Sequence, residues 1–392
     1  MRRYLLPLLL AACVPLALVV GLLLGSHPGI LPGPLEDLVT PNDDAHVYQD
    51  VLDRIGDDFY RKTDKRKLSD AALTAAVKSL DDPFSRYIGP SEYSEFEAST
   101  QGNFGGIGVN VEETPRGLRI LETFPDGPAA KAGLKQGDLI VAVDGKSLKG
   151  RADDATTEIK GPSGTSVRLT VVSGGKQRVE TLQRARVVVP VSRKRMETHD
   201  GAKIGYVSLS QFTAGAHGVV GQNVRQLIDD GAKGIVFDLR HNGGGLLQEG
   251  VLVASVFIPD GLIVYTKGRN RPRRTFDASG DAIDPDIPVA VLVDGGTASA
   301  SEIVTGALQD RKRATVVGQQ TFGKGVFQEI EDLPNHGALD ITVGEYFTPK
   351  GRNLGPHDGK RGLTPDVPVK DDPETKPDEV LQKGLDVVAS QL

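Results

Sequence analysis

The spacing of hydrophobic residues along the chain changes twice. After an uncharged apolar run over residues 5–25, apolar residues recur at helical spacing over 45–60 and over 71–80, with Ser69-Asp70 as the expected N-cap of the second segment. From about Gln101 the period becomes that of strands. The pattern therefore predicts a short helical module followed by a β-rich one.

The β-rich module is expected to cover residues 101–186. A glycine loop, Gly105-Gly106-Ile107-Gly108, leads into its first alternating strand. Further elements are predicted as strands at 118–123, 138–143, 167–172 and 178–182, a short alanine-rich turn at 127–133 and a helix at 153–160.

Strands and helices alternate over the rest of the chain. Strands are predicted at 204–209, 234–239, 289–293 and 315–317, and helices at 218–230, 246–257 and 299–308. This order indicates an α/β domain with parallel strands, in which chemistry gathers beyond the carboxyl ends of the strands. An acidic, proline-rich segment at 365–377 precedes a last short helix.

Composition narrows the function classes. Apolar residues make up 39% of the 392 residues and charged residues 25%, so the chain as a whole is globular, which excludes disorder, collagen and coiled coil. The net charge of −6 and the absence of a long basic block argue against nucleic-acid binding. A single cysteine excludes an internal disulfide and a cysteine-rich zinc site.

The N-terminus indicates export. Arg2 and Arg3 precede the apolar run of residues 5–25, which at about 1.5 Å per residue just spans a bilayer of roughly 30 Å. Cys13 follows Leu10-Ala11-Ala12 as in a lipoprotein acylation site, but the sequence stays apolar beyond it, which favours an ordinary residue of a signal peptide or anchor. We expect residues 26–44 to be a linker and the body to lie in a bacterial periplasm or cell envelope.

Two strand-to-helix junctions carry candidate chemistry. At 234–245 a strand opens into three glycines, whose N–H groups could face an anion or a developing oxyanion, or which could simply form a tight turn. At 289–302 Ser299 stands at the head of a helix. Capping of that helix by Thr297, Ser299 or Ser301, with Glu302 in its first turn, is the alternative.

A serine nucleophile needs a base. His217, His241, His336 and His357 lie in the same predicted domain. Lys324 is the other option, since it stands among glycines and aromatic residues without an acid within four positions, although it could also be a surface lysine. The residues by themselves leave both options open. They contain no Gly-x-Ser-x-Gly elbow, and Gly145-Lys146-Ser147 is not a phosphate loop, because Ile140 occupies the required glycine position.

An ordered set of segments resembles the carboxy-terminal processing (tail-specific) proteases. The set comprises 298–303, 306–310, 313–314, 317–318 and 321–325, together with Asp238-Leu239-Arg240, Asn242 and the glycines that follow. The resemblance runs from about residue 45 to the end. It implies an α/β core of the ClpP/crotonase type over 187–366, an inserted PDZ domain over 101–186, a helical N-terminal module over 45–100 and a C-terminal tail and helix over 367–392.

The resemblance also implies roles for single residues. Ser299 corresponds to the nucleophile, Lys324 to the general base and Gln328 to the residue that orients the lysine. The oxyanion donors correspond to the N–H groups of Ala300 and Gly245, with Gly244 as the alternative. Where many members carry proline this chain has Gly243, and Thr297 replaces a common serine; neither change is expected to touch the chemistry.

The resemblance implies that the PDZ domain holds the free C-terminus of a substrate. Gly105, Gly106 and Gly108 would capture its carboxylate, and Phe104, Ile107 and Val109 would line a pocket for an apolar last side chain. We then expect an endopeptidase acting on loosely folded tails, without a metal or other cofactor. A lipoprotein adaptor and self-association through residues 45–80 are further expectations, and a catalytically silent PDZ scaffold is the alternative function.

Overall fold

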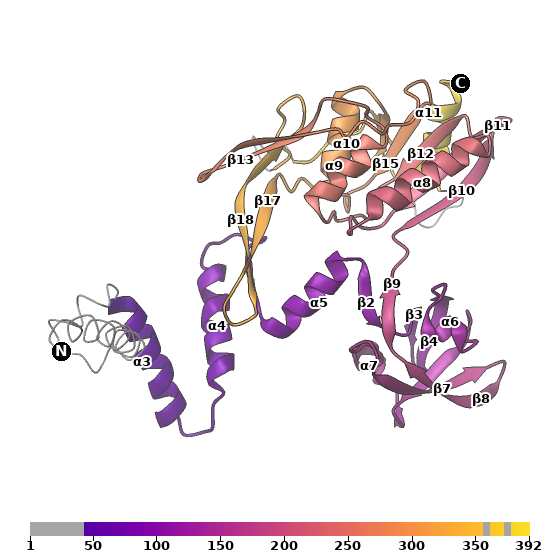
Figure 1. Cartoon of the computed structure of the whole chain (residues 1–392). Coiled ribbons are helices and arrows are strands. Elements are labelled where there is room, and N and C mark those ends of the chain that lie inside the picture. The colour runs from indigo at the N-terminus through magenta and orange to yellow at the C-terminus, as the bar shows by residue number, and fades with distance from the viewer. Residues whose placement is uncertain (1–42, 356–360, 372–377) are drawn as a thin grey trace, which may run out of the picture. The chain divides into compact units, whose positions relative to one another are not determined.

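A computed structural model describes residues 43–355, 361–371 and 378–392 (Figure 1). The chain divides into two compact units, one ending at Leu80 and the other running from Asp81 to Leu392. The predicted signal or anchor at 5–25, with Cys13, lies outside the described residues. None of the helices that are described is long and apolar enough to cross a membrane.

The first unit contains the helices α3 (Asp43–Asp58) and α4 (Lys65–Lys78). Both were predicted, but the predicted start of the second was wrong. Asp64, not Ser69-Asp70, is its N-cap, because the Asp64 side chain accepts the N–H groups of Arg66 at 3.0 Å and Lys67 at 3.4 Å. Ser69 and Asp70 lie inside the helix.

The second unit opens with two elements that the sequence did not indicate. β1 (Arg86–Ile88) pairs with β18 (Ala338–Phe347), far along the chain, and α5 (Pro90–Thr100) follows with its proline in the first turn. Residues 45–100 therefore do not form one helical module, since pairing with β18 places β1 in the second unit.

The β-rich module has the predicted strands, the predicted short helical turn and the predicted longer helix. Its core is one cluster of buried side chains running from Ile107 to Leu182. A separate pair of short strands, β2 (Asn103–Gly106) and β9 (Ala185–Val188), stands where the chain enters and leaves the module. The sheet has the order β3 (Val109–Thr114), β4 (Gly117–Thr123), β5 (Leu139–Val143), β7 (Ser166–Ser173) and β8 (Lys176–Gln183), with β6 (Lys146–Ser147) beside β5 and with helices α6 (Pro128–Lys131) and α7 (Ala152–Ile159).

A six-stranded sheet forms the centre of the rest of the unit. All its neighbouring strands are parallel except β10 and β11. Every residue of β12 and β15 is buried, as expected for central parallel strands covered on both faces. The strand order is β10 (Ser192–His199), β11 (Ala202–Leu209), β12 (Gly234–Asp238), β15 (Val289–Val293), β16 (Thr315–Gly318) and β19 (Val367–Pro368).

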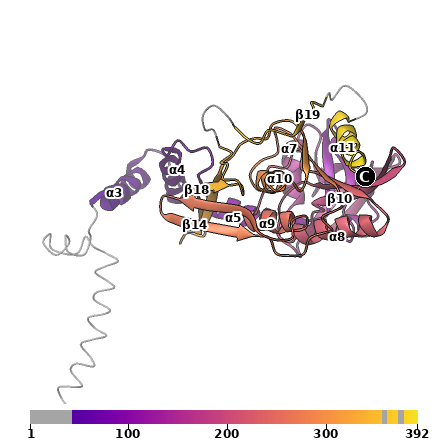
Figure 2. The ribbon, with the colours of Figure 1, turned by 90° about the horizontal axis from the view of Figure 1, so that it is seen from above.

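Helices cover both faces of this sheet, as Figure 2 shows from above. One face packs against α8 (Ala216–Asp229), α9 (Leu247–Ser255) and α10 (Ala300–Asp310). The other face packs against α11 (Glu379–Ala389) alone among the described helices. Alternation along the strands decides the layer, so Phe237 belongs to the first core and Val236 to the second. The predicted α/β class is confirmed.

A second sheet, which the sequence did not indicate, carries one of the candidate residues. Its strands β13 (Leu262–Gly268), β14 (Arg271–Asp277), β17 (Val326–Asp332) and β18 are antiparallel, with β1 at one edge. The loop between β16 and β17 holds Lys324, and β17 itself holds Gln328. Pairing of β17 with β18 thereby fixes Gln328, which faces Thr342 in the register, and with it the end of the Lys324 loop.

Candidate active site

Ser299 stands between the end of β15 and the start of α10. Its backbone has φ 56° and ψ −118°, a conformation that costs an L residue on the order of 1–3 kcal/mol. The preceding turn is held by Thr297, whose buried hydroxyl donates to the Leu239 carbonyl at 2.9 Å and accepts the Asp294 N–H at 3.0 Å. The surrounding hydrogen bonds thus hold a half-exposed serine in a strained turn at the head of a helix, a placement also found for the serine nucleophile of α/β-hydrolases.

Glu302, in the first turn of α10, joins the serine to the lysine loop. It is completely buried. Its Oε2 accepts the backbone N–H groups of Ser299 at 3.0 Å and Lys324 at 3.1 Å. Its Oε1 accepts the Thr321 hydroxyl at 2.6 Å and the Gly323 N–H at 2.8 Å. The side chain that the sequence marked only as a first-turn acid therefore connects two loops that are separate in sequence.

The lysine loop is shaped tightly around this carboxylate. The buried Tyr346 hydroxyl lies 3.3 Å from Glu302 Oε2 and 3.3 Å from the Gly325 nitrogen. Gly325 has φ 68°, and a Cβ there would lie 2.2 Å from the Gly355 nitrogen, so only glycine fits. The glycines beside Lys324 thus allow its backbone to reach Glu302.

The Lys324 side chain is oriented by Gln328, as the resemblance implied. Nζ donates to Gln328 Oε1 at 2.6 Å, and Gln328 Nε2 donates to Thr342 Oγ1 at 2.9 Å. No hydrogen bond joins the Ser299 and Lys324 side chains, both of which are described. The structure therefore brings Ser299, Lys324 and Gln328 into one site with the lysine held by the glutamine.

The surroundings of Lys324 favour its neutral form. Burial lowers the pKa of Lys324, while the charges of Asp340, Asp82 and Glu302 oppose this shift. The ring of Phe84 lies 4.9 Å from Nζ and belongs to the segment that leads into β1. A lowered pKa raises the fraction of neutral amine at a given pH, and the neutral amine is the form that can accept a proton.

The glycine loop after β12 is fixed by Asn242, which is completely buried. Its side-chain nitrogen donates to the Leu209 carbonyl at 2.8 Å, and its Oδ1 accepts the Gly244 N–H at 2.9 Å. Its backbone carbonyl accepts the Ala298 N–H at 3.0 Å and the Ser301 hydroxyl at 2.8 Å. Asn242 thereby attaches the glycine loop to the turn that carries Ser299.

The glycines themselves lie against that turn. Gly244 has φ 102°, and a Cβ there would lie 2.8 Å from Ser299 Cβ; Gly245 has φ 143°, and a Cβ there would meet the Phe212 carbonyl at 2.4 Å. The Gly244 N–H is used by Asn242. Within the described part of the chain, the N–H groups of Gly243, Gly245 and Ala300 have no hydrogen-bond partner, so the predicted donors Gly245 and Ala300 are free to donate and Gly244 is not.

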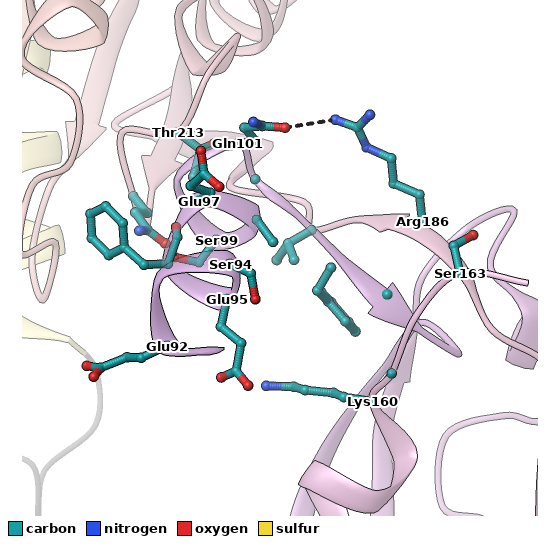
Figure 3. A pocket seen from close by; sticks show the side chains of 18 of the residues that line it. Glu92, Ser94, Glu95, Glu97, Ser99, Gln101, Lys160, Ser163, Arg186 and Thr213 are labelled. Atoms are coloured by element: carbon teal, nitrogen blue, oxygen red, sulfur yellow. Dashed lines mark hydrogen bonds between the residues drawn. The ribbon is translucent and has the colours of Figure 1, made fainter. Parts of the chain in front are cut away.

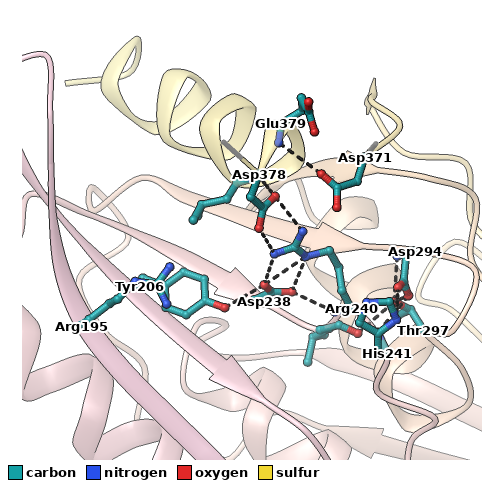
Figure 4. Close-up of polar contacts among 12 residues, drawn as sticks. Arg195, Tyr206, Asp238, Arg240, His241, Asp294, Thr297, Asp371, Asp378 and Glu379 are labelled. Atoms are coloured by element: carbon teal, nitrogen blue, oxygen red, sulfur yellow. Dashed lines mark hydrogen bonds and ion pairs between the residues drawn. The ribbon is translucent and has the colours of Figure 1, made fainter. Parts of the chain in front are cut away.

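An ion cluster lies at the start of the same loop (Figure 4). Arg240 pairs with Asp238, the last residue of β12, at 2.7 Å and with Asp378 at 2.8 Å. The Tyr206 hydroxyl donates to Asp238 at 2.9 Å. Burial, followed by the charge of Asp238, raises the pKa of Tyr206 to about 12. The cluster therefore holds the end of β12 by hydrogen bonds and ion pairs from three side chains.

Two of the candidate histidines pair with carboxylates. His241 is 87% exposed in its side chain and pairs through Nδ1 with Asp294 at 2.6 Å. His217 pairs with Glu249 at 2.8 Å, and His336 lies in the turn between β17 and β18. His357 lies outside the described residues. No histidine that the structure describes hydrogen-bonds to Ser299.

The predicted carboxylate loop lies in and just after β2. Ile107 is 1% exposed and fills the core of the β-rich module, while Phe104 and Val109 are half-buried. Gly106 and Gly108 are buried. The Gly105 carbonyl accepts the Gly161 N–H at 3.1 Å. Of the three predicted pocket side chains, Phe104 and Val109 thus retain accessible surface.

A cavity of about 1120 Å³ opens beside Phe104 and Gly105 (Figure 3). One wall is α5, which presents acidic side chains, and the opposite wall carries Lys160 and Arg186. A third part of the lining is the segment 210–213. This segment supports the glycine loop, because the Phe212 N–H donates to the Gly244 carbonyl at 3.0 Å. The cavity therefore lies between the carboxylate loop and residues next to Phe212, which contacts the glycine loop.

Three features of the site were not predicted. The sequence marked Glu302 as a first-turn acid and Asn242 as part of a motif, without their linking roles. Nothing in it placed Asp378 next to Arg240. Glu302 had one usable signal, an acid three residues after Ser299, whereas the Asp378 contact depends on tertiary structure alone.

This chain is similar to known peptidases and to PDZ domains. The model of Peptidase family S41 matches residues 203–369, and that of the PDZ domain matches 124–173. A carboxyl-terminal-processing protease of Synechocystis is 37% identical over 305 residues, covering 76% of this chain and 70% of that protein. A carboxy-terminal-processing protease of Bartonella bacilliformis is 34% identical over 365 residues, covering 90% of this chain and 81% of that protein. The solved structure of a photosystem II D1 C-terminal processing protease is 31% identical with a TM-score of 0.51, covering 89% of this chain and 92% of that one.

Proposed function

The chain belongs to peptidase family S41 and is a serine-type peptidase, and we propose that Ser299 and Lys324 are its catalytic dyad. The observation that carries this proposal is the shared anchoring of both backbones on Glu302, with the lysine half-buried and held by Gln328. A structural lysine at the surface would need none of these contacts.

The proposed reaction passes through an acyl-enzyme. Ser299 Oγ attacks the carbonyl carbon of the scissile bond while Lys324 Nζ takes the hydroxyl proton. Nζ then gives this proton to the leaving amine as the C–N bond breaks. A water then attacks the ester while Nζ takes its proton, and Nζ returns this proton to Ser299 Oγ as the ester C–O bond breaks and the new C-terminus is released. This reaction requires a hydrogen bond between the Ser299 hydroxyl and Lys324 Nζ that forms on substrate binding. Catalytic hydrogen bonds are often long in the free enzyme and shorten when substrate binds.

The remaining groups act on the two charges that change during this reaction, the oxyanion and the ammonium of Lys324. The N–H groups of Gly245 and Ala300 would hold the oxyanion, an interaction whose loss costs about 10²–10³ in kcat in enzymes of this kind. The lowered pKa of Lys324 increases the neutral amine available as base. Gln328 orients Nζ through a neutral amide. A carboxylate in its place would orient Nζ as well, but its negative charge would raise the pKa of Lys324.

The proposed substrates are protein tails with a free carboxylate. The PDZ domain and the relatives named as C-terminal processing proteases support this substrate class. A tail bound at Gly105–Gly108 would extend through the cavity of Figure 3 towards Ser299. Loosely folded tails suit such a path, since a folded domain would not enter it.

We place the enzyme outside the cytoplasm, in a bacterial cell envelope. The charged start and the apolar run of residues 5–25 support export, and the absence of cysteine after residue 26 suits an oxidising compartment.

The test uses the full chain, its Ser299→Ala and Lys324→Ala variants and an unstructured reporter with an apolar C-terminus. We expect cleavage by the wild type only, together with an ester intermediate trapped at Ser299. Amidation of the reporter tail should raise KM, because it removes the carboxylate.

Activity retained by Lys324→Ala would move the base to another residue and overturn the dyad. If neither wild type nor Ser299→Ala cuts and both bind the tail equally, the protein acts as a scaffold for C-terminal tails and the proposal fails.

A further inference from the structure

The C-terminal helix reaches the glycine loop through one carboxylate. Asp378 is the N-cap of α11, and its Oδ1 accepts the Leu381 N–H at 2.8 Å. The same side chain accepts Arg240 Nη1 at 2.9 Å and Nη2 at 2.8 Å, a two-point pairing that fixes both groups in one plane (Figure 4). A helix cap and an ion pair are therefore combined in Asp378.

Arg240 is held equally firmly on its other side. Asp238 accepts its Nε at 3.0 Å and its Nη2 at 2.7 Å, and also its backbone N–H at 2.9 Å. The guanidinium thus lies between a carboxylate of the central sheet and one of α11. Burial would raise the pKa of Asp378, but the hydrogen bond and charge of Arg240 outweigh it, so this pKa is lowered and the carboxylate stays charged.

The backbone continues directly from this cluster into the proposed oxyanion loop. Only His241 separates Arg240 from Asn242, and the His241 N–H donates to Asp294 at 2.9 Å. Asn242 then holds Gly244, and Gly245 follows with its free N–H. The direction in which the chain leaves β12 is therefore set at Arg240.

Packing holds α11 on the sheet independently of this ion pair. Four of its apolar side chains are buried against alternate residues of β11, β12, β15 and β16: Val380, Leu381, Leu385 and Val388. The charge of Asp378 is thus not needed for docking, which leaves its contact with Arg240 as a separate function.

We infer that Asp378 is a positioning residue for the peptidase reaction: through Arg240 it fixes the loop that carries Gly245, so that the last helix is a working part of the oxyanion site. This inference rests on the proposed roles of Ser299 and Gly245. It makes the C-terminal segment responsible for the geometry of a loop that lies far from it in sequence.

Three variants of the full chain separate positioning from folding. Asp378→Ser keeps a good N-cap, but its single, closer oxygen cannot form the two-point pairing with Arg240. Asp378→Asn keeps the cap without the charge. Asp386→Asn is the matched control. It removes an acid of the same helix that pairs with His199 at 2.8 Å, away from the glycine loop.

The readouts are kcat, KM, the melting temperature and the affinity for a peptide aldehyde, whose adduct with a serine places an oxyanion in the site. We expect Asp378→Ser to lower kcat and aldehyde affinity by a similar factor, on the order of tenfold, with KM little changed. Asp378→Asn should show a smaller loss of the same kind, and Asp386→Asn none.

Wild-type kcat and aldehyde affinity in Asp378→Ser would overturn the inference. So would equal losses in Asp378→Asn and Asp386→Asn, since the effect would then come from helix docking. Failure of the proposed function appears differently, as cleavage that persists in Ser299→Ala or is absent from the wild type.

Discussion

Ser299 and Lys324 donate their backbone N–H groups to the same oxygen of Glu302, at 3.0 and 3.1 Å. The two loops come from different places in the fold, one after β15 and one after β16. Because one buried carboxylate accepts from both, a shift of either loop changes the other. The distance between the proposed nucleophile and base is therefore controlled by backbone contacts, and the Lys324 side chain is held in addition by Gln328.

Replacement of Glu302 by glutamine should separate the two loops. An amide accepts at one terminal atom only, so donors on its other side lose their partner and face an N–H₂ group. Each buried group left unpaired costs about 1–3 kcal/mol of unfolding free energy. Misplacement of the loops should lower kcat by about 10². Reporter cleavage and denaturant unfolding measure both effects.

Glu249→Gln is the control for this variant. Glu249 is also buried and accepts the N–H groups of Gly215 at 2.8 Å and His217 at 3.0 Å. Its loss should lower stability while leaving kcat close to the wild-type value. Full activity in Glu302→Gln would show that the shared carboxylate does not set the geometry.

The three glycines after Asn242 should differ sharply in their tolerance of alanine. At Gly243 nothing lies within 4 Å of an added Cβ, so Gly243→Ala should be active. At Gly245 the Cβ would lie 2.4 Å from the Phe212 carbonyl, in addition to the positive φ, so Gly245→Ala should lose most of its kcat. Cleavage rates of the two variants, with circular dichroism to verify folding, make the comparison. Equal rates would contradict the described loop.

Asp340→Asn should move the pH profile of cleavage to lower pH. Asp340 has the largest opposing effect on Lys324, because its negative charge stabilises the ammonium and raises the pKa, as Asp82 and Glu302 also do to a smaller extent. Arg86, which pairs with Asp340 at 3.4 Å, acts in the other direction. Without the Asp340 charge the pKa of Lys324 falls further, so the neutral amine appears at lower pH.

The measurement is the acid limb of kcat/KM against pH. Asp332→Asn serves as the control, since Asp332 contacts Tyr93 and is not among the groups that act on Lys324. An acid limb that moves to higher pH in Asp340→Asn, or one that moves equally in both variants, would refute Lys324 as the base.

Thr342→Val tests the orientation of Gln328. Valine has the shape of threonine but cannot accept the Gln328 Nε2 hydrogen bond of 2.9 Å. The loss of one such bond, worth about 0.5–1.5 kcal/mol, corresponds to a decrease in kcat of about threefold to tenfold. Thr342→Ser should restore the rate, because it restores the acceptor. A valine variant as fast as the wild type would indicate that Gln328 is held by other contacts.

Local patterns predicted the central elements well because burial on both faces leaves a clear signal. Residues 289–293 form a continuous apolar run, and β15 has the same bounds. The strands around Lys324 were missed for the opposite reason. Residues 326–332 and 338–347 carry mixed polar and apolar residues, and β17 and β18 are stabilised mainly by pairing with each other and with distant strands.

The same distinction holds for the site. Ser299, Lys324 and Gln328 were identified through short segments whose order along the chain is distinctive. The roles of Glu302 and Asp378 depend on partners 22 and 138 positions away, to Lys324 and Arg240 respectively. No local pattern records such a distance, so these contacts required the folded chain.

The positive φ of Ser299 lowers the stability of the fold at the position of the proposed nucleophile. An alanine at this position removes the hydroxyl but keeps the strain of a positive φ, whereas a glycine removes both. Relief of strain worth about 1–3 kcal/mol exceeds the entropic cost of glycine, about 0.5–1 kcal/mol, so Ser299→Gly should unfold at a higher temperature than Ser299→Ala. Selection for stability alone would then favour glycine at this turn, at the cost of the proposed nucleophile.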